Sequence, residues 1–137
     1  MWMRCKPLLA SVALMASMST GRADAEGPPL KTVHLFNVAS ASAEAELLGA
    51  LDEMNQAIAK EGYPQSRYRV WRVQGDQQGS KAYLWESTWP DRATYAKVHA
   101  AQSYQRAFER VRSAIEASVK DQVYNRYVEV PVARTKK

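Results

Sequence analysis

The side chains that could do chemistry gather in one stretch, STWPDRATYAKVH, at residues 87–99. It contains Trp89, Tyr95 and His99, and His99 is one of only two histidines in the chain. Because histidine titrates near neutral pH, we name His99 as the candidate catalytic residue, a general base or hydrogen-bonding group. The alternative is a helix-end histidine that bonds a backbone carbonyl, since the sequence places no acid to orient it.

Candidate ligand-binding residues lie on this stretch and on predicted strands. His34 alternates with Val33 and Leu35, so it can point into an interior that holds aromatic rings. Such rings can stack on a flat ligand, although core packing also explains buried indoles. In the second strand, no pattern decides between Trp71 and Arg72. The candidate ligand-binding residues are His34, Phe36, Trp71, Tyr83, Trp85, Trp89 and Tyr95.

Strand alternation groups several of these residues by face. His34 and Phe36 share one face of the first strand, and Tyr83 and Trp85 share one face of the third, whereas Leu84 suits the side packed against helices. We expect the mixed aromatic and polar faces to line a cavity between the sheet and the start of the second helix.

Motifs for metals and common cofactors are missing from the sequence. It has no glycine-rich phosphate loop, no zinc-type Cys/His spacing and no serine nucleophile motif. The two histidines have no carboxylate cluster nearby, so we expect no metal and no cofactor. Three arginines, Arg69, Arg72 and Arg126, can bind an anion if they face inward, but solvated strand positions explain them too.

The first 25 residues have the pattern of a secretory signal peptide. Arg4 and Lys6 precede the apolar run Leu8–Met18, which is too short for a stable bilayer anchor. Ala23 and Ala25 are the small residues that a signal peptidase reads. We expect cleavage after Ala25 and a periplasmic or secreted protein; an uncleaved N-terminal anchor is the alternative.

Cleavage changes the composition of the chain. The single cysteine, Cys5, leaves with the signal, which excludes disulfides and thiolate chemistry from the mature protein. Three basic residues and one acidic residue also leave, so the net charge falls from +5 to +3. We therefore expect no nucleic-acid partner and, after cleavage, no membrane association. Residues 26–137 suit a single domain with one core.

The order of predicted elements indicates the fold. Strand-type sequences cover residues 31–38, 68–74, 81–88 and 122–130. A first helix is expected to follow Ser40 and to end before Gly62. Asp91 caps a second, short helix, which restarts at Ser103, and an apolar stripe extends this part to Val119. This β-α-β-β-α-β order predicts a ferredoxin-like α+β fold, an antiparallel four-stranded sheet with both helices on one face.

The opposite sheet face is expected to be too apolar for water. Aromatic residues of the strands make this face apolar, and the strand register decides which of them lie on it. The candidates are Phe36, Trp71, Trp85 and Tyr127. An open face of this kind predicts a partner, and a homodimer packed sheet against sheet is the simplest one.

The segment LWESTWPDRATYAKVHAAQSYQRAF, together with this element order, resembles the antibiotic-biosynthesis-monooxygenase-like group of the dimeric α+β barrel superfamily. In that group a Trp-containing strand end commonly precedes a polar helix start, an aromatic residue, a histidine and a Ser–aromatic pair. The matching residues are Trp89, Asp91, Tyr95, His99, Ser103 and Tyr104. The resemblance covers the mature chain in element order and this segment alone in residue detail.

The resemblance implies a dimeric α+β barrel and a small-molecule role. Some members oxidise aromatic polyketides without a cofactor, and others degrade heme with an Asn, a Trp and a His. Val98 and Phe108 stand where that Trp and His are expected, and Phe36 matches the Asn position about as well as Asn37. Heme degradation is therefore disfavoured.

Three functions stay open at this level. The first is an exported dimer that binds a small apolar or aromatic molecule without chemistry. The second is a cofactor-independent, monooxygenase-like enzyme. The third is a non-catalytic structural or interaction dimer whose aromatic face serves assembly only.

Overall fold

The computed structural model describes residues 27–75 and 79–133. The predicted signal peptide lies outside the described residues. The elements, in chain order, are β1 (Leu30–Val38), α1 (Ala41–Lys60), a 3-10 turn (Pro64–Ser66), β2 (Arg69–Arg72), β3 (Tyr83–Trp89), α2 (Arg92–Ala100), α3 (Gln102–Ser118) and β4 (Val119–Val128). This order confirms the predicted ferredoxin-like fold.

The second helical region is divided where the sequence predicted a restart. The backbone at Ala101 is extended, with φ −66° and ψ 139°, and it separates α2 from α3. Ser103 is not the cap, because α3 begins at Gln102 and the Ser103 hydroxyl donates to Glu61 instead. At its other end α3 runs directly into β4, which starts at Val119 rather than at the predicted residue 122.

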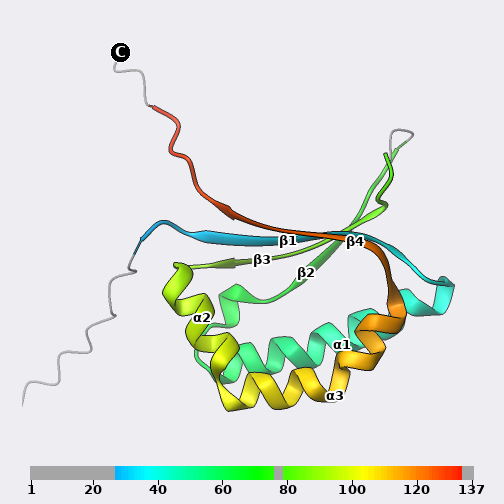
Figure 1. The fold of residues 1–137 in the computed structure, drawn as a ribbon, viewed down its shortest axis with the longest axis horizontal. Coiled ribbons are helices and arrows are strands. Elements are labelled where there is room, and N and C mark those ends of the chain that lie inside the picture. Colours follow the sequence, from blue (N-terminus) through cyan, green and yellow to red (C-terminus); the bar gives the residue numbers. More distant parts are fainter. Residues whose placement is uncertain (1–26, 76–78, 134–137) are drawn as a thin grey trace, which may run out of the picture.

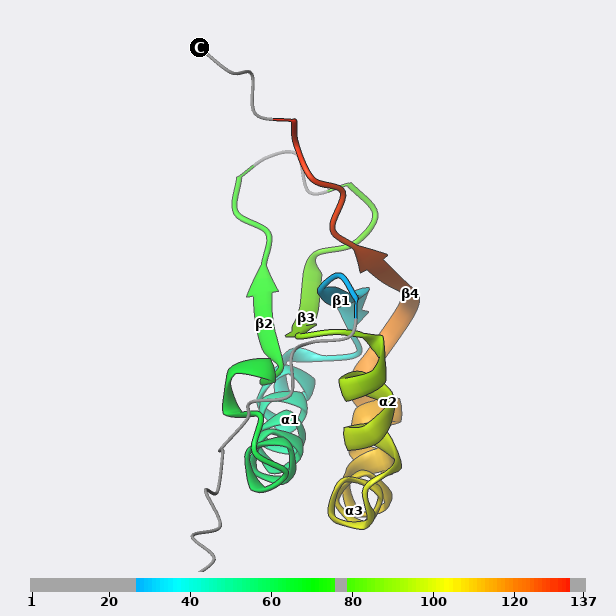
Figure 2. The same ribbon diagram turned by 90° about the vertical axis from the view of Figure 1, so that its left-hand side faces the viewer.

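The four strands form one antiparallel sheet in the order β2-β3-β1-β4. All three helices lie on one side of this sheet, as Figures 1 and 2 both show. The central strand β1 therefore pairs with β3 on one side and with β4 on the other. Within the described residues no helix is long and apolar enough to cross a bilayer.

The strand register decides which residues face the helices. His34 is paired with Trp85, and Phe36 with Tyr83, so these four side chains share one face, as strand alternation predicted. That face is the one beneath the helices, because Phe36 and Trp85 belong to the buried core. The prediction that Leu84 packs against the helices was wrong: it lies on the opposite, open face.

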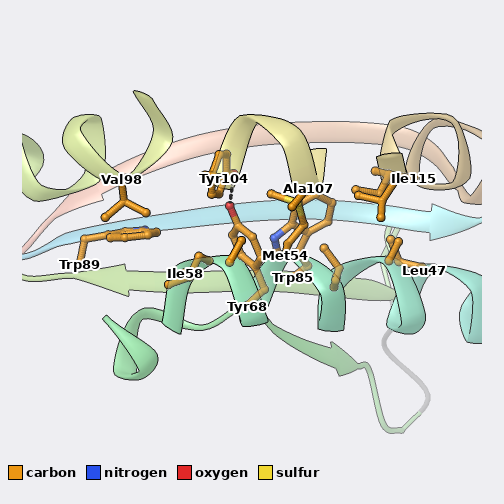
Figure 3. Close-up of a cluster of buried hydrophobic side chains, with 14 of the residues drawn as sticks. Leu47, Met54, Ile58, Tyr68, Trp85, Trp89, Val98, Tyr104, Ala107 and Ile115 are labelled. Atoms are coloured by element: carbon orange, nitrogen blue, oxygen red, sulfur yellow. Dashed lines mark hydrogen bonds between the residues drawn. The ribbon is translucent and has the colours of Figure 1, made fainter. Parts of the chain in front are cut away.

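The core fills the space between the sheet and the helices. Trp85 and Trp89 project from β3 toward Met54 and Ile58 of α1 and Val98 of α2 (Figure 3). Trp89 and Val98 are each only 1% exposed, and Phe36 is fully buried. Apolar burial of this kind is the main driving force for folding.

The open face keeps several large side chains in contact with solvent. Trp71 is 55% exposed, and Val123 and Tyr127 of β4 are 45% and 47% exposed. The register places Trp71 and Val123 in one row with Leu84 and Leu35, whereas Tyr127 lies beside Lys31. The predicted aromatic open face therefore exists, with Trp71 and Tyr127 on it and Phe36 and Trp85 on the other side.

Candidate functional site

The corner between β3 and α2 positions the most polar part of the core. Pro90 follows the last residue of β3, and Asp91 caps α2 by accepting a hydrogen bond from the Thr94 amide at 2.6 Å. The Trp89 indole N–H donates to the Ser87 hydroxyl at 2.8 Å, which orients the ring beneath α2. Proline and aspartate thus have structural roles here.

His99 is held by both of its ring nitrogens. Its Nδ1 lies 2.8 Å from the Tyr95 carbonyl oxygen, which can only accept, so Nδ1 carries the proton. Burial lowers the pKa of His99, which favours the neutral ring. Nε2 is then an acceptor, and it lies 3.3 Å from the Tyr68 hydroxyl.

This arrangement sets the direction of a short hydrogen-bond chain. If Tyr68 donates to His99, its oxygen accepts from the Tyr104 hydroxyl, 2.6 Å away (Figure 3). Burial raises the pKa of Tyr68 well above its usual range and that of Tyr104 to about 12. Both phenols are therefore neutral at physiological pH.

His34 forms the second polar centre on the same side of the sheet. Its ring stacks on Trp85 at 3.9 Å between centroids and also contacts the Tyr124 ring at 4.5 Å. Burial lowers the pKa of His34 to about 4. The Tyr124 hydroxyl is hydrogen bonded to that of Tyr95 at 3.2 Å, which links β4 to α2.

We call this group the aromatic–histidine cluster; its members are His34, Tyr68, Tyr95, His99, Tyr104 and Tyr124. Its imidazole and phenol groups lie among aromatic rings. Tyr124 is 42% exposed, and the two imidazoles are half-buried, so the cluster is reachable from solvent on one side. In chemical terms it can donate and accept hydrogen bonds, and the Nε2 lone pair of His99 can accept a proton.

The predicted site residues fall into three groups. Trp89, Tyr95 and His99 meet at the β3–α2 corner, where the ring centroids of Tyr95 and His99 are 3.8 Å apart. A second group continues this aromatic layer along the helix side of the sheet: His34, Phe36, Tyr83 and Trp85. Trp71 stands apart, on the open face.

Several of these rings fill the space where a cavity was expected. Phe36 and Trp89 are buried in the core, and Trp85 is 7% exposed. Among the described residues, a groove of about 650 Å³ lies elsewhere, between α1 and α3. Its lining is mainly polar and charged side chains. The accessible part of the predicted site is its rim, at His34, Tyr95 and His99.

Sequence reasoning missed three members of the cluster. Tyr104 was counted only as part of the apolar stripe of α3 or of the Ser–aromatic pair. Nothing in the sequence around Tyr68 or Tyr124 indicated a site residue, because both were recognised only as parts of predicted strands. Their roles depend on contacts between residues far apart in the chain. The candidate arginines Arg69 and Arg72 are exposed, which agrees with solvated strand positions.

Among the described residues, no group of three or more His, Cys, Asp or Glu side chains could hold a metal ion. No protein-family model and no curated protein matches the sequence. Solved structures do match. SnoaB, a cofactor-independent oxygenase from Streptomyces nogalater, is 15% identical with a TM-score of 0.53, over 77% of this chain and 97% of that chain.

Two further structures agree in fold. A DABB-family protein with a ferredoxin-like fold from Mesorhizobium loti is 18% identical, covers 77% of this chain and all of its own, and has a TM-score of 0.56. A dimeric ferredoxin-like protein of unknown function from Thermobifida fusca is 14% identical over 76% of this chain and 93% of its own, with a TM-score of 0.55. The chain therefore has the ferredoxin-like fold that these structures share. At these identities the likeness shows the fold alone.

The lowered pKa of His34 predicts a loss of stability in acid. An unfolded histidine binds a proton near pH 6.5, whereas folded His34 does so only near pH 4. Between these values the unfolded chain holds one more proton at this residue. The free energy of unfolding should therefore fall as pH is lowered from 6.5 to 4, by up to about 1.4 kcal/mol per pH unit.

Urea unfolding of the wild type and of His34→Gln across this pH range measures the effect. The variant should show a shallower dependence on pH. Arg69→Gln, which removes a charge that does not titrate in this range, should keep the wild-type slope. Equal slopes for the wild type and His34→Gln would contradict the prediction.

Proposed function

We propose that this chain is an exported homodimer that binds a small aromatic or apolar molecule at the aromatic–histidine cluster. The observation that carries the proposal is the convergence of uncharged hydrogen-bonding groups within a layer of aromatic rings. Sites for small molecules usually combine an apolar lining with a few such groups. The neutral imidazoles of His34 and His99 favour an uncharged ligand over an anion.

The rim of the cluster suits a flat ligand. The rings of Tyr95, His99 and Tyr124 are partly accessible, so a ligand can stack on them without displacing the core. Hydroxyl groups at Tyr95 and Tyr124 can exchange their mutual hydrogen bond for one to a ligand oxygen. A flat aromatic that carries a hydroxyl or carbonyl group meets both requirements.

A cofactor-independent, monooxygenase-like activity is a second candidate. It is favoured by the Nε2 atom of His99, which is unprotonated, as a general base requires; a substrate would replace the Tyr68 hydroxyl as its hydrogen-bond partner. A fold neighbour, SnoaB, is described as a cofactor-independent oxygenase. His99→Ala would abolish such turnover, whereas in a pure binding protein it would change affinity alone.

The open face supports the proposed homodimer. An isolated protomer leaves Trp71, Val123 and Tyr127 about half exposed, at roughly 25 cal/mol for each Å² of apolar area that a partner could cover. Two copies related by a two-fold axis would cover both patches at once. The fold neighbour from Thermobifida fusca is described as dimeric.

We expect ligand binding to depend on the face that Tyr124 occupies. Calorimetric titration with 2-naphthol, a flat and uncharged probe, should give saturable binding. Tyr124→Ala should weaken it about fivefold, because stacking on one ring is worth about 1 kcal/mol. Tyr127→Ala is the matched control: the same residue type, on the same strand and similarly exposed, but on the open face.

Tyr127→Ala should bind 2-naphthol as the wild type does, at protein concentrations where light scattering shows the same mass for both. Equal loss of affinity in the two variants would mean that the probe binds elsewhere. Absence of saturable binding to the wild type at millimolar 2-naphthol would count against the proposed ligand class.

We expect dimerisation to fail when charge is placed on the open face. Val123→Asp should raise the dimer dissociation constant at least about a hundredfold, because a two-fold interface loses two buried valines of about 1.5 kcal/mol each. Leu48→Asp is the control, since Leu48 is also 45% exposed but lies on α1. Analytical ultracentrifugation distinguishes them; a monomeric wild type at micromolar concentration would overturn the assembly.

We expect the full-length chain to be exported and shortened in a bacterial host. N-terminal sequencing of the protein recovered outside the inner membrane should begin at Glu26, because Ala23 and Ala25 match the signal-peptidase preference. Ala25→Arg should leave the precursor uncleaved. A mature protein that retains Leu8–Met18 would contradict the proposed processing.

A further inference from the structure

The segment that follows β4 is apolar and has no support from its own protomer. We call residues 129–133, with the sequence EVPVA, the C-terminal arm. Val130 is 81% exposed and Val132 is 91% exposed, more than any other large apolar side chain of the described chain. Val128, the last residue of β4, is already 58% exposed.

The arm extends beyond the strand that supports β4. The pairing of β1 with β4 ends at Leu30 and Val128, so the arm has no strand of the sheet beside it. Figures 1 and 2 both show the chain after β4 rising on the side of the sheet opposite the helices. The arm therefore leaves its own core and points into the space above the open face.

The sequence of the arm suits contact through side chains. Val130 and Val132 are two residues apart, which in an extended chain places them on one side. Pro131 has no backbone N–H and cannot donate to a neighbouring strand. Apolar side chains that are this exposed in one copy gain free energy when another surface covers them.

We propose that the C-terminal arm of one protomer packs its valines against a second copy of this chain. The inference rests on the proposed homodimer and adds a contact to it. A second copy seated on the open face occupies the space into which the arm points. Its own apolar patch, around Leu84 and Trp71, offers the surface that Val130 and Val132 lack.

Two-fold symmetry doubles the contribution of the arm. Each copy gives one arm and receives one, so every valine of the arm is buried twice in the dimer. The alternative occupant is the protomer's own open face, which would require the arm to reverse its direction. The alternative predicts cross-links within one chain and no effect of the arm on dimer dissociation. The proposal predicts cross-links between two copies and a dissociation constant that depends on the arm.

The test compares two single aspartate substitutions in the same arm. Val130→Asp should raise the dimer dissociation constant about a hundredfold, since one buried valine is worth about tenfold and the dimer holds two. Ala133→Asp adds the same charge at a position outside the valine series and should change the constant less than threefold. Sedimentation over a dilution series measures all three proteins.

A photo-cross-linking amino acid at position 132 supplies an independent readout. We expect cross-links between two copies, to open-face peptides that contain Trp71 or Leu84, and a covalent dimer on a denaturing gel. A dimeric wild type whose Val130→Asp variant dimerises equally well, or whose cross-links lie within one chain, would overturn the arm proposal alone. A monomeric wild type would overturn the proposed homodimer as well.

Discussion

The structure depends on the register of β1 against β3. That register pairs His34 with Trp85 and Phe36 with Tyr83, and a slip of β1 by one residue would send His34 and Phe36 to the open face. Side-chain bonds specify it at both ends. Asn37 accepts from the Ala82 amide at 3.0 Å and donates to the Ser80 carbonyl at 3.0 Å, while the hydroxyls of Thr32 and Ser87 bond at 2.7 Å.

Much of the fold follows from local patterns. Strand composition and helix periodicity indicated every main element in the right order, and Asp91 caps α2 as its position before the helix predicted. It was harder to predict which residues of each strand face the helices. Alternation sorts residues into two sets but does not say which set meets the helices, and here both sets are apolar: Leu35 and Leu84 on one face, Phe36 and Trp85 on the other.

The candidate site could be predicted only in its local part. The bond from His99 to the Tyr95 carbonyl joins residues one helical turn apart, so it could be foreseen. The contacts of the other nitrogen could not, because Tyr68 reaches it from the segment before β2. Tyr104 lies on the apolar stripe of α3, and its hydroxyl partner, Tyr68, is 36 residues away in the chain.

The two faces of the sheet serve separate purposes on the same strands. Strand β1 carries His34 on the helix side and Val33 and Leu35 on the open side, and β3 carries Trp85 and Leu84 in the same way. A partner on the open face would therefore restrict the motion of these strands without touching the aromatic–histidine cluster. Because His34 stacks on Trp85, the cluster depends on the same β1–β3 pairing that presents Leu35 and Leu84 to a partner in the proposed dimer.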